Sequence, residues 1–153
     1  MTQKTRTCLW FEKGGLEAAR FYVSLLPDSA LELQNWRGED EPIVVDFTLA
    51  GTPYQILNGG PHYKLSPAAS ISVLTDDQAE TDRLWDALTA DGGEESRCGW
   101  LLDRWGLSWQ IVPRALIEMQ TAEDRDAAAR ANEAMLQMNK IDIAALRAAF
   151  DQA

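Results

Sequence analysis

The sequence has one histidine, two cysteines and fourteen basic residues against twenty-four acidic ones. Its net charge of −10 repels phosphate backbones and anionic headgroups, so we expect neither nucleic-acid nor membrane partners. No stretch approaches the roughly 20 apolar residues that span a bilayer, and the N-terminal segment lacks an apolar signal core. We therefore expect a cytoplasmic location, with Cys8 and Cys98 present as reduced thiols.

The rest of the composition is that of an ordinary folded protein. Hydrophobic residues make up 46% and charged residues 25% of the 153 residues, which is too apolar for a disordered chain. This length is enough for one well-buried core. We expect a single domain over residues 1–153.

The chain contains an internal repeat. Residues 7–22 align without a gap with residues 70–85, and a glutamate, an arginine and an apolar-aromatic pair coincide. Further along, GTPYQIL at 51–57 matches GLSWQIV at 106–112. Repetition at a fixed offset is typical of a duplicated structural unit. We infer two diverged copies of one module.

Each copy shows the periodicity of a strand, a helix and three further strands. The first copy predicts strands at 7–11, 31–36, 43–49 and 54–57, a helix before Pro27, and a polar turn at 37–42. The second predicts a strand at 68–74, a helix at 77–90 and three short strands leading to Pro113. We therefore expect an α+β fold of two βαβββ modules, at residues 5–60 and 67–113.

A helical tail is expected over residues 114–153. Thr121-Ala-Glu-Asp124 resembles a capping box before an alanine-rich helix, and a second helix is predicted to start at Asp142. The apolar stripes of these helices predict core or a dimer surface, with a ligand role as the alternative.

Several stretches between the first strand and the last helix carry a family resemblance. They are EAARFY at 17–22, LNGGP at 57–61, CGWLLD at 98–103, GLSWQIVP at 106–113 and AMLQMNKIDI at 134–143. With them the chain resembles the PhnB-like branch of the vicinal oxygen chelate superfamily, the fold of glyoxalases, bleomycin-resistance proteins and extradiol dioxygenases. The resemblance implies a curved eight-stranded sheet around a small cavity, helices outside and a homodimer. Some members also carry a demethylubiquinone methyltransferase label.

The resemblance also indicates where a metal would lie. Metal-dependent relatives hold a divalent ion with one side chain from the first and one from the last strand of each module. Those positions fall on Gln55 and Gln110, and near Thr7 and Ser70. The set offers neutral oxygens without imidazole or carboxylate, which bind transition metals poorly. We expect no catalytic metal and no cofactor.

Strand alternation places Gln55 and Gln110 on the inner face of each sheet, with Ile56 and Ile111 pointing toward the helices. An amide both donates and accepts hydrogen bonds, which suits a polar ligand. The alternative is that each glutamine satisfies a neighbouring backbone group.

Three further positions are candidates in the first module. Asp46 alternates with apolar neighbours and is the candidate general base, or else a hydrogen-bonded surface acid. His62 is the only histidine, on a loop at the mouth of the module, where it is either a catalytic group or incidental. Asn58, in Asn58-Gly-Gly-Pro61, belongs to a ligand-covering turn or a structural corner.

We therefore expect a protein that binds a small polar molecule between its modules, without a metal, through Thr7, Gln55, Asn58, Ser70 and Gln110. Three alternatives remain: a metal-dependent glyoxalase or dioxygenase-type enzyme, a methyltransferase as in the family label, and a non-catalytic dimeric module associating through its tail. The sequence does not decide whether the protein is an enzyme.

Overall fold

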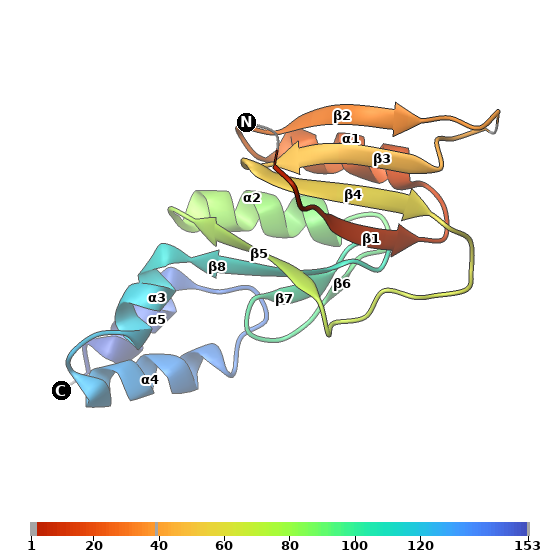
Figure 1. Cartoon of the computed structure of the whole chain (residues 1–153). Coiled ribbons are helices and arrows are strands. Elements are labelled where there is room, and N and C mark those ends of the chain that lie inside the picture. The colour runs from red at the N-terminus through yellow and green to blue at the C-terminus, as the bar shows by residue number, and fades with distance from the viewer. Residues whose placement is uncertain (1–2, 39, 153) are drawn as a thin grey trace. The chain divides into compact units, whose positions relative to one another are not determined.

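A computed structural model describes residues 3–38 and 40–152, so residue 39 of the predicted polar turn lies outside the described residues. The chain divides into two compact units, Met1–Leu65 and Ser66–Ala153. Each unit holds one four-stranded sheet, so the strands do not form one continuous sheet of eight. The α+β architecture of two βαβββ modules followed by helices is confirmed (Figure 1).

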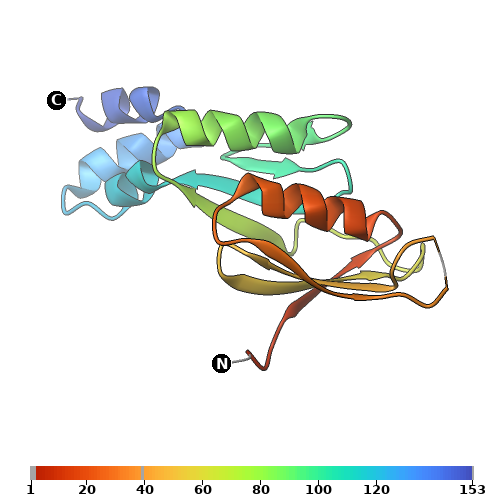
Figure 2. The same cartoon turned by 90° about the horizontal axis from the view of Figure 1, so that it is seen from above.

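The first unit contains one helix and four strands in the predicted order. Its elements are β1 (Thr7–Phe11), α1 (Gly15–Leu25), β2 (Ala30–Asn35), β3 (Val44–Leu49) and β4 (Thr52–Asn58). The strand order is β1-β4-β3-β2, with β1 parallel to β4 and the other neighbours antiparallel. Helix α1 lies along one face of this sheet, as Figure 2 shows from above.

The core of the first unit lies between α1 and that face. Successive strand residues point to opposite faces, so β3 buries Val45, Phe47 and Leu49 and turns the intervening residues away. The aromatic rings of Tyr22 and Phe47 lie 6.2 Å apart, and both side chains are fully buried. Each large apolar side chain buried in this way contributes about 1.5–3 kcal/mol to stability.

The second unit repeats the arrangement with shorter strands. Its elements are β5 (Ser70–Thr75), α2 (Gln78–Thr89), β6 (Glu94–Glu95), β7 (Trp100–Leu102) and β8 (Ser108–Pro113), in the sheet order β5-β8-β7-β6. Helix α2 begins in a reciprocal cap. The Asp77 carboxylate accepts from the Glu80 backbone N–H at 2.8 Å, and the Glu80 carboxylate accepts from the Asp76 N–H at 2.9 Å.

The tail consists of α3 (Arg114–Gln120), α4 (Arg125–Met135) and α5 (Ile143–Phe150). Helix α3 was not predicted, and the capping box at Thr121 is wrong. The Thr121 hydroxyl donates to the Ile117 carbonyl and so belongs to the end of α3, while Asp124 caps α4 by accepting from the Ala127 N–H at 3.0 Å. The predicted start at Asp142 is confirmed, because its carboxylate accepts from the Ala145 N–H at 3.0 Å.

The apolar stripes of the tail helices form a core. The cluster joins all three tail helices and consists of Leu116, Met119, Ala131, Ile141 and Leu146. Met135, Met138 and Phe150 pack against it. The predicted homodimer stays a prediction. Across the described residues, every helix is too short or too polar to cross a bilayer.

The segment 138–143 attaches the tail to the second module. The backbone N–H groups of Cys98 and Gly99 donate to the Met138 and Asn139 carbonyls, both at 2.8 Å. The Gln78 amide donates to the Ile141 carbonyl at 3.0 Å and accepts from the Ile143 N–H at 2.8 Å. One side chain of α2 thus satisfies both backbone groups that flank Asp142.

We expect Gln78→Ala to weaken this attachment. The substitution leaves the Ile141 carbonyl and the Ile143 N–H without their partner, at a cost of about 1–3 kcal/mol. Urea unfolding measures the loss, and hydrogen exchange locates it at residues 138–143. Gln137→Ala, at an exposed tail glutamine, is the control and should change neither. Unchanged exchange at Ile143 in Gln78→Ala would contradict the assignment.

Candidate functional site

The face of the first sheet opposite α1 carries a connected set of polar side chains. Asp46 and Thr48 of β3 alternate with the buried Val45, Phe47 and Leu49, and Gln55 precedes the fully buried Ile56 on β4. The predicted alternation is therefore confirmed. We call Arg6, Cys8, Glu32, Asp46, Thr48 and Gln55 the polar face of the first sheet.

Arg6 links the strands of this face. Its Nη1 donates to the backbone carbonyls of Phe47 and Tyr54 at 3.3 and 3.1 Å. Its Nη2 lies 2.6 Å from a Glu32 carboxylate oxygen, and its Nε lies 3.6 Å from Asp46 Oδ2. Thr48 donates to the other Glu32 oxygen at 3.1 Å. One guanidinium therefore neutralises part of the charge of two carboxylates, and sequence reasoning missed it.

Gln55 and Asp46, two of the predicted residues, are in direct contact. Gln55 Nε2 donates to Asp46 Oδ1 at 2.8 Å, and the two residues are register partners between β3 and β4. A carboxylate oxygen accepts hydrogen bonds, so the amide nitrogen faces Asp46 and the carbonyl oxygen is turned elsewhere. No described residue donates a hydrogen bond to that carbonyl oxygen. The alternative that Gln55 satisfies a backbone group is not what the structure shows.

The first-strand residue beside Gln55 is Cys8. In the parallel pairing of β1 with β4, Cys8 is the partner of Gln55 and Thr7 that of Tyr54. Thr7 shares its side of β1 with the buried Leu9 and therefore points away from Gln55. Partial burial raises the pKa of the Cys8 thiol, and the Asp46 carboxylate raises it further. Cys8 is thus a neutral, weakly nucleophilic member of the polar face.

The contacts of Asp46 bear on its two predicted roles, a general base or a hydrogen-bonded surface acid. Its carboxylate accepts a hydrogen bond from Gln55 and pairs with Arg6. Each of its two carboxylate oxygens therefore has a partner on the polar face. The arrangement is that of a hydrogen-bonded acid.

Asn58 is the last residue of β4, and its side chain contacts the start of α1. Its Oδ1 accepts from the Gly15 N–H at 2.9 Å, and its Nδ2 donates to the Pro42 carbonyl at 2.8 Å. The Glu41 carboxylate accepts from the Gly14 N–H at 3.0 Å. The chain's own side chains therefore satisfy the N–H groups that begin this helix. The structural corner describes Asn58 better than a ligand-covering turn.

His62 is exposed on the loop between β4 and β5. The neighbouring Tyr63 stacks edge-on against Trp10, with ring centroids 4.9 Å apart, and the Trp10 indole N–H donates to the Gly60 carbonyl at 2.9 Å. These contacts attach the loop to Trp10 of β1 through Tyr63 and Gly60. His62 has no hydrogen bond or ion pair with another described residue.

In the second sheet, the predicted residues Gln110 and Ser70 are joined by a hydrogen bond. Gln110 Nε2 donates to the Ser70 hydroxyl at 2.9 Å. The register of β5 with β8 places Ser70 beside Ser108 and Ser72 beside Gln110, whereas Cys8 is beside Gln55 in the first unit. The first strands of the two modules therefore correspond at an offset one residue larger than the sequence alignment suggested.

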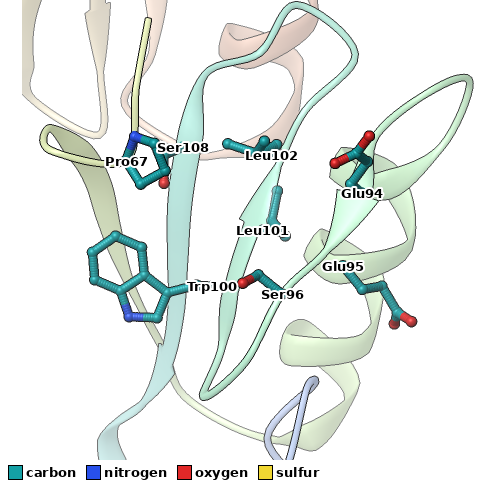
Figure 3. A pocket seen from close by; sticks show the side chains of 8 residues that line it. All are labelled: Pro67, Glu94, Glu95, Ser96, Trp100, Leu101, Leu102 and Ser108. Carbon is teal, nitrogen blue, oxygen red and sulfur yellow. The ribbon is translucent and has the colours of Figure 1, made fainter.

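A pocket of about 190 Å³ lies over the strands of this second sheet (Figure 3). Trp100 and Leu102 of β7 contribute apolar surface, and Ser108 of β8 is almost fully buried. Glu94 and Glu95 project from β6 to different sides, and Glu95 accepts from the Trp85 indole N–H at 2.6 Å. The pocket lining does not include Gln110, but Trp100, which lines the pocket, is the register partner of Gln110 between β7 and β8.

The donors present do not fit a catalytic metal ion. Gln55 and Gln110 would offer a metal ion only their neutral amide oxygens, because their nitrogens donate to Asp46 and Ser70. Glu32 and Asp46, the two carboxylates of the polar face, both pair with the guanidinium of Arg6. In the part of the chain that the structure describes, no three His, Cys, Asp or Glu side chains form a group that suits a metal.

Comparison with known proteins agrees with this fold. The family described as 3-demethylubiquinone-9 3-methyltransferase matches residues 3–112. The PhnB protein from Bacillus cereus is 28% identical, with a TM-score of 0.66 over 72% of this chain and 99% of that one. No curated protein matches the chain.

Two more distant structures share the fold alone. A glyoxalase/bleomycin resistance protein from Albidiferax ferrireducens T118 is 12% identical, with a TM-score of 0.51 over 74% of this chain and 99% of that one. A variant of the fosfomycin resistance protein FosX from Listeria monocytogenes, complexed with Mn(II) and 1S,2S-dihydroxypropylphosphonic acid, is 13% identical. Its TM-score is 0.53 over 73% of this chain and 92% of that one. The chain therefore belongs to the 3-demethylubiquinone-9 3-methyltransferase family, a PhnB-like group with the glyoxalase fold.

Proposed function

We propose that this protein binds a small polar molecule on the polar face of the first sheet, with Gln55 as the central contact and without a metal ion. The observation that carries the proposal is the Gln55 amide. Its nitrogen is bonded to Asp46, and its carbonyl oxygen has no donor among the described residues. That oxygen is not among the buried polar atoms that lack a partner, so water or a ligand can reach it and supply a hydrogen bond.

The neighbours of Gln55 support a binding role. Arg6 holds Glu32 and Asp46 in place, so the amide is oriented before any ligand arrives. Thr48 and Cys8 provide a small hydroxyl and a neutral thiol beside it. We include Ser70 and Gln110 as a second contact pair, and the cavity between the modules stays a prediction.

The other predicted residues receive smaller roles in this proposal. Asn58 acts through the start of α1, since both ends of its amide are bonded. His62 is exposed, which makes it the least supported catalytic candidate. Thr7 shares its face of β1 with the core, and Cys8 replaces it as the first-strand contact.

A ligand bound on this face should be lost in Gln55→Leu. We expect some members of a set of small alcohols, amines and carboxylic acids to bind and to shift the backbone amides of β3 and β4 in ¹H–¹⁵N NMR spectra, a signal that the native chain and its variants share. The substitution removes the hydrogen-bonding group while keeping its size, and should weaken this binding about tenfold or more. Gln137→Leu, at an exposed tail glutamine, is the matched control. Equal binding by the two variants would refute the proposal.

Cys8 reports on the same face through its reactivity with iodoacetamide. Because Asp46 raises the pKa of the Cys8 thiol, less thiolate is present at a given pH. Asp46→Asn should therefore increase the alkylation rate at pH 8 by roughly two- to fivefold, and burial should keep the pKa above its ordinary value. Mass spectrometry of peptides follows Cys8, with Cys98 as the internal control. An unchanged Cys8 rate would place Asp46 away from the thiol.

Two alternatives predict other ligands. The structure of FosX contains Mn(II), and the family description names a methyltransferase. In this chain Arg6 pairs with both carboxylates of the polar face. Glu41 and Asn58 accept from the backbone N–H groups at the glycine-rich start of α1, where a cofactor phosphate would bind.

We therefore expect protein purified without chelator to contain no stoichiometric manganese, zinc, iron or nickel by elemental analysis. Calorimetry should likewise show no saturable micromolar binding of S-adenosylmethionine. One tightly bound ion per chain would favour the metal-dependent enzyme. Saturable S-adenosylmethionine binding would favour the methyltransferase.

A further inference from the structure

We infer that the ligand of the polar face presents a hydrogen-bond donor, such as a hydroxyl or an ammonium group, and that oxyanions are rejected. This inference deepens the proposed function and rests on it. Its basis is the way in which Arg6 and Asp46 orient the Gln55 amide.

The orientation of Gln55 follows from chemistry rather than from the position of two similar atoms. An amide oxygen and nitrogen can exchange places with little change in shape. Here the partner is a carboxylate oxygen 2.8 Å away, and two acceptors at that distance would repel each other. The nitrogen therefore faces Asp46. At Gln110 the partner is the Ser70 hydroxyl, which both donates and accepts, so that amide is not oriented in the same way.

Arg6 keeps Asp46 a hydrogen-bond acceptor, so Asp46 does not donate to Gln55. A guanidinium only donates, and its Nε lies 3.6 Å from Asp46 Oδ2 while its Nη2 pairs with Glu32. The two Nη1 contacts to the Phe47 and Tyr54 carbonyls anchor it to β3 and β4. The Asp46 side chain is 13% exposed, so these partners fix the orientation of its carboxylate. Arg6 and Asp46 are thus positioning residues for Gln55.

The polar face offers a ligand more hydrogen-bond acceptors than donors, which favours a ligand that donates a hydrogen bond. Gln55 offers a carbonyl oxygen with two lone pairs, against one remaining N–H that lies next to the Asp46 carboxylate. An oxyanion would approach two carboxylates and would compete with them for Arg6. The net charge of −10 adds long-range repulsion of anions. A hydroxyl meets an acceptor, and an ammonium meets an acceptor beside two carboxylates that outnumber the single guanidinium of Arg6.

Asp46→Asn should invert this arrangement. Arg6 continues to require an oxygen, so the new amide at position 46 turns its nitrogen toward Gln55. Gln55 must then turn its own oxygen inward, because two amide nitrogens cannot share one hydrogen bond. Its N–H groups face the ligand in place of the carbonyl oxygen. The substitution is nearly isosteric, so its effect is on polarity rather than on packing.

The experiment compares matched probes that differ in hydrogen-bonding character. Benzylamine and benzoate form a charged pair, and phenol and methoxybenzene form a neutral pair of a donor and an acceptor. Dissociation constants come from NMR titration of the backbone amides of β3 and β4 in the full chain, a signal that Gln55→Leu also retains. In the native protein we expect benzylamine and phenol to bind about tenfold or more tightly than their partners. In Asp46→Asn we expect the preference within the neutral pair to reverse.

Glu32→Gln is the control for charge, because it also removes one carboxylate from the polar face but leaves the Asp46–Gln55 contact in place. It should weaken the discrimination against benzoate without changing the preference for phenol. The inference would be overturned if the preference for phenol over methoxybenzene reversed in both Asp46→Asn and Glu32→Gln, or in neither. If Asp46→Asn does not fold, the native preference and its loss in Gln55→Leu decide the ligand class.

The outcomes also separate this inference from the proposed function. Native binding of benzoate as tight as that of benzylamine, and lost in Gln55→Leu, would keep the site and refute the donor preference. No response of the β3 and β4 backbone amides to any probe would refute both.

Discussion

The burial of one face of each sheet under a helix determines the rest of this structure. Val45, Phe47 and Leu49 lie against α1, and their burial leaves the alternate residues of β3 on the other face. A shift by one residue would move this whole apolar set into water, so the register is strongly specified. The positions of Asp46 and Thr48 follow from the packing of their neighbours. The polar face is thus a consequence of the core.

Polar groups inside each module are largely satisfied by the chain itself. Asn58 and Glu41 cap α1, and Asp77 caps α2. Asp103, which is 3% exposed, accepts from the backbone N–H groups of Trp105 and Leu107 and from the indole of Trp109. These bonds hold turns and helix ends, where unpaired groups would destabilise the fold. In contrast, the carbonyl oxygen of Gln55 accepts no hydrogen bond from a described residue.

The fold is shared with proteins of different chemistry, so it does not identify the reaction. FosX is complexed with Mn(II) in its structure, whereas here the polar face pairs carboxylates with an arginine and an amide. An arginine–carboxylate network supplies a fixed pattern of donors and acceptors instead of a Lewis acid.

The sequence by itself determined the two βαβββ modules, the alternation that places Gln55 and Asp46 on the sheet face opposite the helix, and the helix start at Asp142. Each of these depends on the local periodicity of apolar residues or on a cap within a few positions. Only the tertiary structure decided that Arg6 joins Glu32 to Asp46, that Asn58 caps a helix 43 residues away, and that Cys8 rather than Thr7 lies beside Gln55. These contacts join strands distant in sequence, and a one-residue change in register reverses which side chain is presented.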